Sequence, residues 1–210
     1  MKCRSCNSDS LELILDLGEQ PWCNDFLSEN RVGKEKLYPL RLNHCTDCGL
    51  LQLDHTVPKE TMFGDHCYLS GMTQTLKNHF YEVADENVKQ FQIQPNDLVV
   101  DIGGNDGTQL QQYQECGIEN VLNVECAERV SEISRENGVK TITEYFNKKC
   151  VQDHIGENSV KLFNASGVFF HLEELHSVID GIKLALRDDG VLIVQFMYAG
   201  TMVEKLNFDT

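Results

Sequence analysis

Apolar runs alternate with segments of helical periodicity over the second half of the chain, from about residue 96 onward. The runs with the length and composition of buried strands are 98–103, 120–126, 139–146, 159–167 and 191–198. The segments with a helical pattern are 108–117, 128–138 and 172–190. Such alternation is typical of a parallel sheet flanked by helices. We therefore predict an α/β fold with five strands in this part of the chain.

The part of the chain before residue 96 follows two other patterns. Residues 73–91 place apolar side chains near one stripe of a helix, and Ser70 or Thr73 can cap its start. Residues 1–60 show no helical pattern, and they contain strand-like runs at 11–17 and 49–55. The predicted organisation is a small module (1–60), a helical connector (61–95) and the α/β domain (96–210).

Composition excludes several classes of protein. The chain has 210 residues, with 18 Lys and Arg against 33 Asp and Glu, and its formal net charge is -15. A chain this acidic is a poor general binder of nucleic acid, although one small anionic ligand can still bind in a local pocket. The sequence contains no run of 18 apolar residues and does not start like a signal peptide. We therefore expect no membrane association and a cytoplasmic location.

Four of the nine cysteines form two CxxC pairs, Cys3 with Cys6 and Cys45 with Cys48. Two such pairs can supply the four thiolates of a closed, tetrahedral Zn²⁺ site. The alternatives are four thiols without a metal, or a redox pair of the thioredoxin type, which would require a βαβ pattern that neither pair has. The remaining cysteines have no ligand spacing and are interpreted as small core residues: Cys23, Cys67, Cys116, Cys126 and Cys150.

The segment DIGGNDGT, residues 101–108, follows the first strand of the α/β domain. It lacks the Lys-Ser/Thr of a P-loop, and its glycines do not fit the G-x-G-x-x-G of a dinucleotide loop. What remains is an acid, then Gly103, then Gly107 after three residues, which resembles the first motif of Rossmann-like, S-adenosylmethionine-dependent methyltransferases. Gly103 would let the backbone pass close to a ligand, and Gly107 would let the next helix pack tightly.

Other residues near this loop fit the same interpretation. Asn105 tolerates a left-handed backbone, and Asp101 or Asp106 can accept a hydrogen bond from the amino-acid end of the ligand. Glu125 ends the second strand, where a carboxylate can accept the two ribose hydroxyls of an adenosine. The alternatives are a solvated strand end at Glu125 and an ordinary tight turn at the glycines.

Further segments narrow the resemblance. After the CxxC pairs come DLGEQPWCNDFL (16–27), CYLSGMTQTLKNHF (67–80), the loop at 101–108, NVECA (123–127) and GVFFHLEEL (167–175). In this order they resemble the first half of the sugar C-methyltransferases, which methylate a carbon of a nucleotide-linked 4-keto deoxysugar. The resemblance implies a zinc-binding module, a class I methyltransferase domain cut after its fifth strand, and the cofactors S-adenosylmethionine and Zn²⁺.

The resemblance also assigns roles to residues. Tyr68 is the candidate for the reacting centre, with a packing aromatic as the alternative, and His171 is interpreted as structural or next to the cofactor. Gly167 and Gln195 depart from the family, which often has Asn and Glu there. The predicted cofactor site comprises Asp101, Gly103, Asn105, Asp106, Gly107, Glu125 and Asn164, and the predicted metal site comprises Cys3, Cys6, Cys45 and Cys48.

The family's proposed base and its sugar-binding domain correspond to sequence beyond Thr210, so we expect these residues to bind cofactor and to turn over poorly. The expected partner is a nucleotide-sugar, and an open edge on the fifth strand predicts a homodimer or cover by the tail. Two other functions fit the same motifs. One is a small-molecule O- or N-methyltransferase, and the other is a non-catalytic protein that binds cofactor or zinc.

Overall fold

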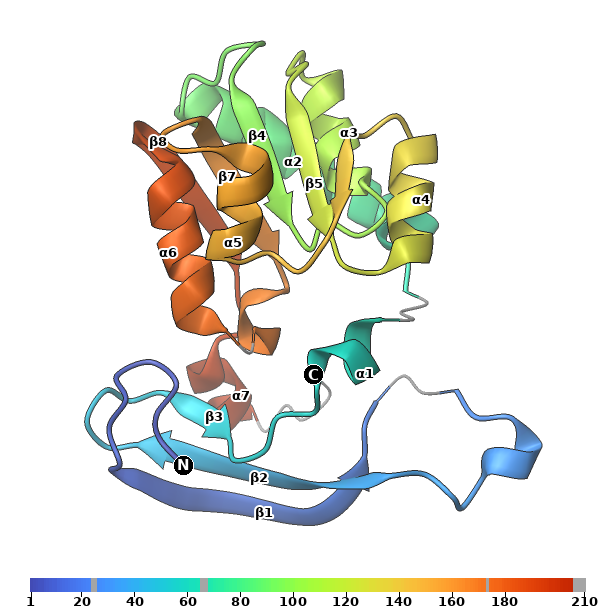
Figure 1. Cartoon of the computed structure of the whole chain (residues 1–210), viewed down its shortest axis with the longest axis vertical. Helices are drawn as coiled ribbons and strands as arrows, with labels where there is room; N and C mark the ends of the chain where they lie inside the picture. The colour runs from blue at the N-terminus through green and yellow to red at the C-terminus, as the bar shows by residue number, and fades with distance from the viewer. Residues whose placement is uncertain (24–25, 65–67, 173, 206–210) are drawn as a thin grey trace. The chain divides into compact units, whose positions relative to one another are not determined.

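Figure 1 shows a computed structural model of the chain, which describes residues 1–23, 26–64, 68–172 and 174–205. The chain divides into two compact units. One comprises Met1–Met62 together with the segment from Tyr198 onward, and the other comprises Phe63–Met197.

In the first unit, the described residues form an antiparallel sheet of three strands in the order β1-β2-β3. Its strands are β1 (Leu11–Pro21), β2 (Leu37–Cys45) and β3 (Leu51–Leu53). The unit also contains a 3-10 turn η1 (Glu29–Arg31) and a helix α7 (Ala199–Lys205), and a further helix α1 (Lys59–Phe63) lies at its boundary. The expected strands at 11–17 and 49–55 are present as β1 and β3.

The central strand β2 was not predicted from the sequence. Pro39 lies within it, and a proline demotes a segment that otherwise looks like a strand. Arg41 of β2 forms ion pairs with Asp16 of β1 at 3.3 Å and with Asp54 at 3.4 Å. These contacts with both neighbouring segments favour the central position of β2.

In the second unit, the described residues form a parallel sheet of five strands in the order β6-β5-β4-β7-β8. Its strands are β4 (Leu98–Ile102), β5 (Val121–Glu125), β6 (Thr141–Thr143), β7 (Val160–Ser166) and β8 (Leu186–Gln195). The parallel α/β architecture predicted from the alternating pattern is confirmed. β4 lies at the centre of the sheet, so the loop that follows it starts between the ends of β5 and β7.

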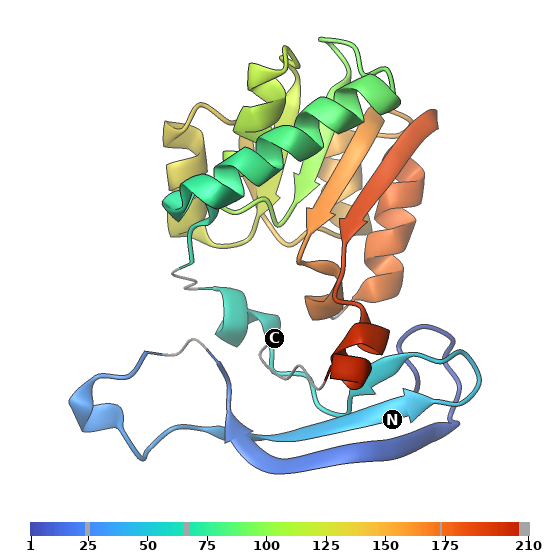
Figure 2. The ribbon, with the colours of Figure 1, turned by 180° about the vertical axis from the view of Figure 1, so that it is seen from behind.

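Helices cover both faces of this sheet. Figure 2 shows α2 (Gln74–Gln90) crossing one face, where it packs against α3 (Thr108–Glu115). α5 (Lys148–Cys150), the π-helical turn η3 (Val151–Ile155) and α6 (Leu175–Ala185) cover the face seen in Figure 1. The helix α4 (Glu128–Glu136) lies against β5 and β6, and two 3-10 turns, η2 (Ser70–Met72) and η4 (Phe169–His171), complete the unit.

Two apolar clusters fill the space between the sheet and its helices. Val100, Ile102 and Phe163 belong to the cluster under α5 and α6, and Val99 and Leu162 belong to the cluster under α2 and α3. Alternate residues of one strand thus face opposite clusters, as the pleat of a strand requires. The two-sided burial explains why these strands appear in the sequence as continuous apolar runs.

The helix expected over 172–190 is shorter than predicted, since α6 ends at Ala185 and β8 already begins at Leu186. Leu186 pairs with Val160 in the sheet, and the register then shifts so that Val191 pairs with Leu162. The intervening residues carry Arg187 and Asp189, whose partners lie far away in the sequence. Those long-range contacts explain why the local helical pattern gave the wrong end.

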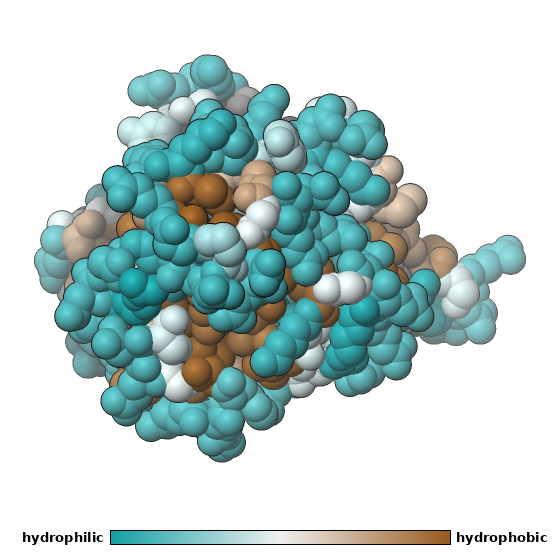
Figure 3. All heavy atoms as spheres, turned by 90° about the horizontal axis from the view of Figure 1, so that it is seen from above, coloured by the Kyte–Doolittle hydropathy of each residue, from teal (hydrophilic) through white to brown (hydrophobic). Residues whose placement is uncertain are grey.

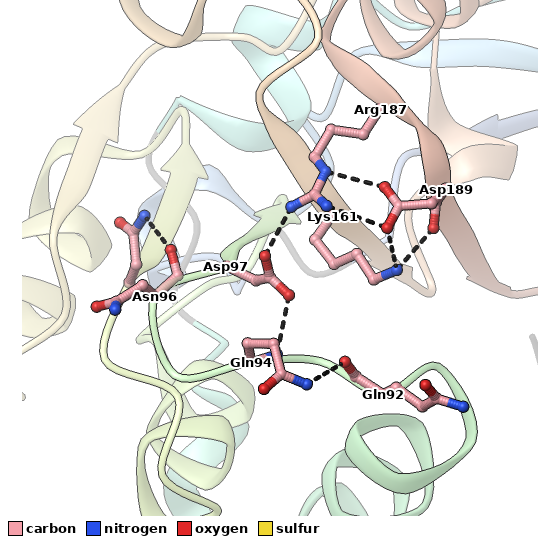
Figure 4. A network of polar contacts seen from close by, with 8 residues as sticks. Gln92, Gln94, Asn96, Asp97, Lys161, Arg187 and Asp189 are labelled. Atoms are coloured by element: carbon pink, nitrogen blue, oxygen red, sulfur yellow. Dashed lines mark hydrogen bonds and ion pairs between the residues drawn. The ribbon is translucent and has the colours of Figure 1, made fainter.

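Figure 4 shows these contacts at the amino ends of the strands. The Arg187 guanidinium donates to Asp97 at 2.6 Å and to Asp189 at 2.9 Å. The Lys161 ammonium donates to the Asp189 carboxylate at 2.9 Å and to its carbonyl oxygen at 2.8 Å. The Lys161 side chain is only 9% exposed, and these bonds lower the pKa of Asp189. The network therefore holds a nearly buried cation where β7 meets β8.

Two surface features bear on partners. Within the described residues, β8 pairs with β7 only and so forms an edge of the sheet, as predicted for the fifth strand.

The face seen in Figure 3 is mostly hydrophilic, with hydrophobic atoms visible in patches between the polar side chains. Among the described helices, none combines the length and the apolar character needed to cross a membrane.

The network around Lys161 predicts an asymmetry between two substitutions. Asp189→Ala should lower the free energy of unfolding by about 1–3 kcal/mol, because it removes a charged acceptor from a nearly buried ammonium group. Lys161→Met should cost less, because Asp189 is 56% exposed and keeps Arg187 as its partner. Urea denaturation at neutral pH measures both values. A Lys161→Met variant at least as destabilised as Asp189→Ala would contradict this account.

Candidate metal and cofactor sites

The two CxxC pairs fold into two similar turns. The N–H of Asn7 donates to the carbonyl oxygen of Cys3 at 3.0 Å, and the N–H of Gly49 donates to that of Cys45 at 2.8 Å. Asn7 and Gly49 both have a left-handed backbone, with φ of 59° and 79°. Asn and Gly tolerate this conformation better than other residues, so each turn can close directly after its second cysteine.

These turns bring the four predicted ligands together. The Sγ atoms of Cys3, Cys6, Cys45 and Cys48 all lie within 4.8 Å of one another. The separation is 3.6 Å between Cys3 and Cys48 and 3.7 Å between Cys6 and Cys45. Sulfur atoms about 2.3 Å from a tetrahedral Zn²⁺ ion lie about 3.8 Å apart, so the four residues fit this ion. A backbone hydrogen bond from Cys6 lowers the pKa of Cys3 to about 6. A backbone hydrogen bond from Ser8 acts to lower the pKa of Cys6, but burial and the neighbouring thiols raise it to about 12.

Gln52 of β3 holds the first turn in place. Its Oε1 accepts a hydrogen bond from the N–H of Arg4 at 2.8 Å, and its Nε2 donates to the carbonyl oxygen of Lys2 at 3.3 Å. The Gln52 side chain is buried. Gln52 was not predicted, because a lone glutamine in a strand has no distinctive spacing.

The glycine-rich loop follows β4 and contains three residues in left-handed conformations. Gly103, Asn105 and Gly107 have φ values of 66°, 53° and 78°. A Cβ atom on Gly107 would lie 2.6 Å from Ser134 Oγ, so this glycine is required for close packing at the start of α3. A Cβ atom on Gly103 would lie 2.8 Å from Val168 Cγ2. The contact of Gly107 agrees with its predicted role in tight helix packing, and close passage of Gly103 to a ligand stays a prediction.

Glu125 lies at the end of β5, next to this loop. Its Oε2 accepts the N–H of Asn105 at 3.1 Å, and its Oε1 accepts the N–H of Ala127 at 2.9 Å. The residue is 8% exposed, so it is not the solvated strand end of the alternative interpretation. Oε1 also accepts the Cys126 thiol at 3.5 Å, so Oε2 is the oxygen with a lone pair left to accept a ligand hydroxyl. The residues present thus fit the ribose of an adenosine.

Asp101 lies beneath the same loop. A Cβ atom on Gly104 would be 2.8 Å from Asp101 Oδ2 and 2.6 Å from Asn123 Oδ1, so both groups are directly under the loop backbone. Burial, and secondly the charge of Glu125, raise the pKa of Asp101 well above its ordinary value. Asn123 Nδ2 donates to the carbonyl oxygen of Asn105 at 2.9 Å. Asn123 was not predicted, although it lies two residues before Glu125 on the same face of β5.

Asn164 is fully buried in β7, beside Asp101 in the sheet register. Its Oδ1 accepts a hydrogen bond from the Tyr113 hydroxyl at 3.1 Å, and this hydroxyl accepts one from Asn87 Nδ2 at 2.8 Å. Burial raises the pKa of Tyr113 to about 12, so the phenol stays protonated and can donate. Asn164 Nδ2 has no hydrogen-bond partner among the described residues. Its amide is therefore the part of the residue that has a bond left to make.

Asn105 and Asp106 direct their side chains to a different part of the chain. Asn105 Oδ1 accepts the N–H of Ser70 at 2.9 Å, and Asp106 Oδ2 accepts the N–H of Gly71 at 2.7 Å. Asp106 Oδ1 accepts the N–H of Thr108 at 3.1 Å. The segment that contains Tyr68 is thereby held against the glycine-rich loop.

The aromatic candidates lie in two places. Tyr68 is 56% exposed, in the segment that contacts the loop. The ring of His171, in η4, packs against the rings of Phe63 at 5.4 Å and Phe170 at 4.4 Å between centroids. Thr73 caps α2, since its side chain accepts the N–H of Leu76 at 3.4 Å. The predictions that concern Cys67 and the terminal residues 206–210 lie outside the described residues.

Two segments of the chain match known protein families. Residues 3–63 match the family described as "Putative zinc binding domain", and residues 100–194 match the "Methyltransferase domain". The C-methyltransferase NovU of Streptomyces niveus is 26% identical over 211 residues, which cover 100% of this chain and 50% of NovU. The chain thus spans about half the length of this curated relative.

Solved structures share the fold. The PH0226 protein from Pyrococcus horikoshii OT3 has a TM-score of 0.53 at 17% identity, over 66% of this chain and 62% of that one. A "putative s-adenosyl-l-methionine-dependent methyltransferase" from Methanococcus maripaludis has a TM-score of 0.51 at 15% identity, over 65% and 68%.

The fold and the two matched domains define a zinc-binding domain followed by a domain with the class I methyltransferase fold. The match to the C-methyltransferase NovU over the whole of this chain agrees with the resemblance that its motifs indicate. The expectation of an S-adenosylmethionine-dependent methyltransferase fold with a four-cysteine zinc module is confirmed at this level.

The cysteine geometry predicts one equivalent of bound zinc. Cys3→Ser should lose this metal and unfold the sheet of β1, β2 and β3, because a structural zinc ion contributes on the order of 10 kcal/mol to folding. Cys23→Ser, which changes an exposed cysteine outside the group of four, is the control and should keep both metal and stability. Elemental analysis and thermal denaturation measure the two effects. Metal-free protein, purified without a chelator, would show the assignment to be wrong.

Proposed function

We propose that this chain provides the zinc-binding and cofactor-binding parts of an S-adenosylmethionine-dependent C-methyltransferase that acts on a nucleotide-linked keto-deoxysugar. The observation that carries the proposal is the buried carboxylate of Glu125, hydrogen-bonded to the N–H of Asn105 in the glycine-rich loop. The four-cysteine group in the same chain and the similarity to a C-methyltransferase support it.

Each residue of the cofactor site has a role that follows from its surroundings. Glu125 accepts the ribose hydroxyls through its remaining lone pairs. Gly103 and Gly107 keep the loop backbone close to the ligand, and Asp101 faces the ligand's ammonium group, whose charge favours the ionised acid. Asn164 supplies an amide N–H group that has no partner among the described residues.

The cofactor supplies an electrophilic methyl group, so the protein must position a nucleophilic carbon and remove water. A ketone on the sugar acidifies the adjacent C–H bond, and a base must accept this proton. Tyr68 is our candidate for a residue at the reacting centre, because its segment is bonded to the loop that binds the cofactor. Much of the rate then comes from the position of the two reactants.

We also propose that a second copy of the chain pairs with the open edge of β8. Val194 and Phe196 are exposed there, at 36% and 56%. The described part of the tail forms the helix α7 and not a further strand. An edge strand presents unpaired N–H and C=O groups to any other chain, and a second copy would satisfy them.

The function predicts how two glutamates differ in cofactor binding. Glu125→Ala should weaken binding of S-adenosylmethionine or S-adenosylhomocysteine by at least about 10- to 150-fold, which corresponds to the loss of one charged hydrogen bond of about 1.5–3 kcal/mol. Glu132→Ala, an exposed position on α4, should bind as the wild type does. Isothermal titration calorimetry measures both. Equal affinities in the two variants would reject the role of Glu125.

Substrate class is tested in the same samples with labelled cofactor and a panel of nucleotide-linked 4-keto sugars. Cofactor affinity should rise in the presence of the right sugar, because the methyl donor and the sugar would bind next to each other in one active site. Methylation of small-molecule oxygen or nitrogen acceptors instead would favour another acceptor class.

The edge of β8 predicts a dimer whose contacts depend on concentration. The amides of 191–195 should exchange slowly at high concentration and faster on dilution, as the pairing with the second copy is lost. Hydrogen exchange and sedimentation velocity measure this. A monomer whose amides exchange at the same rate at all concentrations would exclude the second copy as the cover.

A further inference from the structure

The segment Tyr68–Met72 is held on the glycine-rich loop by three hydrogen bonds between residues 35 to 37 positions apart. Asn105 Nδ2 donates to the carbonyl oxygen of Tyr68 at 2.9 Å, and Asn105 Oδ1 accepts the N–H of Ser70 at 2.9 Å. Asp106 Oδ2 accepts the N–H of Gly71 at 2.7 Å. We call these three bonds the clasp. They use the backbone of the segment, so the side chains of Tyr68 and Met72 stay exposed, at 56% and 76%.

Close approach of Gly71 shows that the clasp is tightly built. A Cβ atom on this residue would lie 2.7 Å from Thr108 Oγ1 and 2.9 Å from Asp106 Oδ2. Both distances are shorter than a Cβ atom can normally make, so a larger residue would push the segment away from the loop. Gly71 does not have a positive φ, so its need for glycine comes from contact and not from backbone strain.

Asn105 connects the clasp to the acid that we assign to the ribose. Its N–H donates to Glu125 Oε2 at 3.1 Å while its side chain makes two of the three clasp bonds. Its left-handed backbone, with φ of 53°, lets this one residue bond to Glu125 through its N–H and to the segment Tyr68–Met72 through its side chain. Asp106 is 3% exposed, and both of its carboxylate oxygens already accept backbone N–H groups.

We propose that the Asn105 and Asp106 side chains are positioning residues that seat the Tyr68 segment on the cofactor loop, and that they do not bind the cofactor themselves. The inference rests on the proposed function and deepens it. The residues bonded to the cofactor loop also carry the candidate for the reacting centre, so the clasp sets where Tyr68 lies relative to the methyl donor. The proposal thus gives Asn105 and Asp106 a role that differs from the cofactor contacts predicted from their position in the sequence.

Asn105→Gly is the variant that tests the clasp most directly. Glycine adopts the left-handed backbone and keeps the N–H that donates to Glu125, so only the clasp bonds of the side chain are lost. Asn158→Gly is a matched control, because Asn158 is an exposed asparagine with φ of 47° outside the loop. Gly71→Ala tests the same contact from the other side.

Hydrogen exchange and calorimetry provide the readouts. Asn105→Gly should speed exchange of the Ser70 amide by about 5- to 13-fold, the equivalent of about 1–1.5 kcal/mol for one hydrogen bond, and Asn158→Gly should not. Affinity for S-adenosylhomocysteine should stay within about threefold of wild type in Asn105→Gly, in contrast to Glu125→Ala. Gly71→Ala should speed exchange at Ser70 and Gly71 together, again without loss of cofactor affinity.

Each outcome decides one part. A loss of affinity in Asn105→Gly as large as in Glu125→Ala would show that Asn105 is a cofactor ligand and overturn the inference. An unchanged Ser70 amide would show that there is no clasp in solution. If wild-type protein binds no cofactor, the proposed function fails, and the exchange rates at Ser70 and Gly71 still decide the clasp independently.

Discussion

The structure of the α/β unit depends on one backbone constraint, the left-handed turn that follows its central strand. Gly103, Asn105 and Gly107 all have positive φ within five residues. This conformation directs the N–H of Asn105 to Glu125 and its carbonyl oxygen to Asn123. Because the loop backbone bonds to the neighbouring strand, a change in its path would disturb the strand-end acid as well. The turn thus fixes both the position of the Glu125 carboxylate and the packing of the loop against β5.

The zinc unit is held together by metal ligands more than by an apolar core. Its strands bury few side chains, and β1 has mostly exposed positions. Cys3 and Cys45 are buried, while Cys6 and Cys48 are exposed, so the site lies at the boundary of a small core. A unit of about 60 residues rarely gains enough stability from apolar burial alone, and a structural metal is a common supplement. This explains why the cysteine spacing was easier to interpret than the strands around it.

Features that depend on nearby residues could be predicted from the sequence, and features that depend on distant partners could not. The parallel strands, the cysteine turns and the glycine-rich loop each arise within a few residues of sequence. The early end of α6 depends on Arg187, whose partner Asp97 lies 90 positions away. The bonds that Asn105 makes to Tyr68 and Ser70 cross 37 and 35 positions. No local pattern encodes such pairings, which is why the glycine-rich loop could be recognised before the residues that it holds.

Asp101 shows how stability and ligand binding oppose each other at the carboxyl end of the sheet. Its raised pKa means that the folded protein holds the proton more tightly than the unfolded chain does. The contribution to stability is therefore fully present at low pH, and it is lost as pH rises from about 4 through the folded-state value. Its register partners Asn123 and Asn164 each have one buried amide atom without a hydrogen-bond partner among the described residues.

A cationic ligand group beside Asp101 would favour the ionised carboxylate, so its binding would be linked to release of this proton. The same buried acid that lowers the stability of the free protein near neutral pH is then complementary to a positive charge. The acceptor Asn123 Oδ1, which has no hydrogen-bond partner among the described residues, would add to that complementarity. Buried polar groups without partners lower the free energy of unfolding. They are expected at binding sites, where a ligand supplies the missing partners.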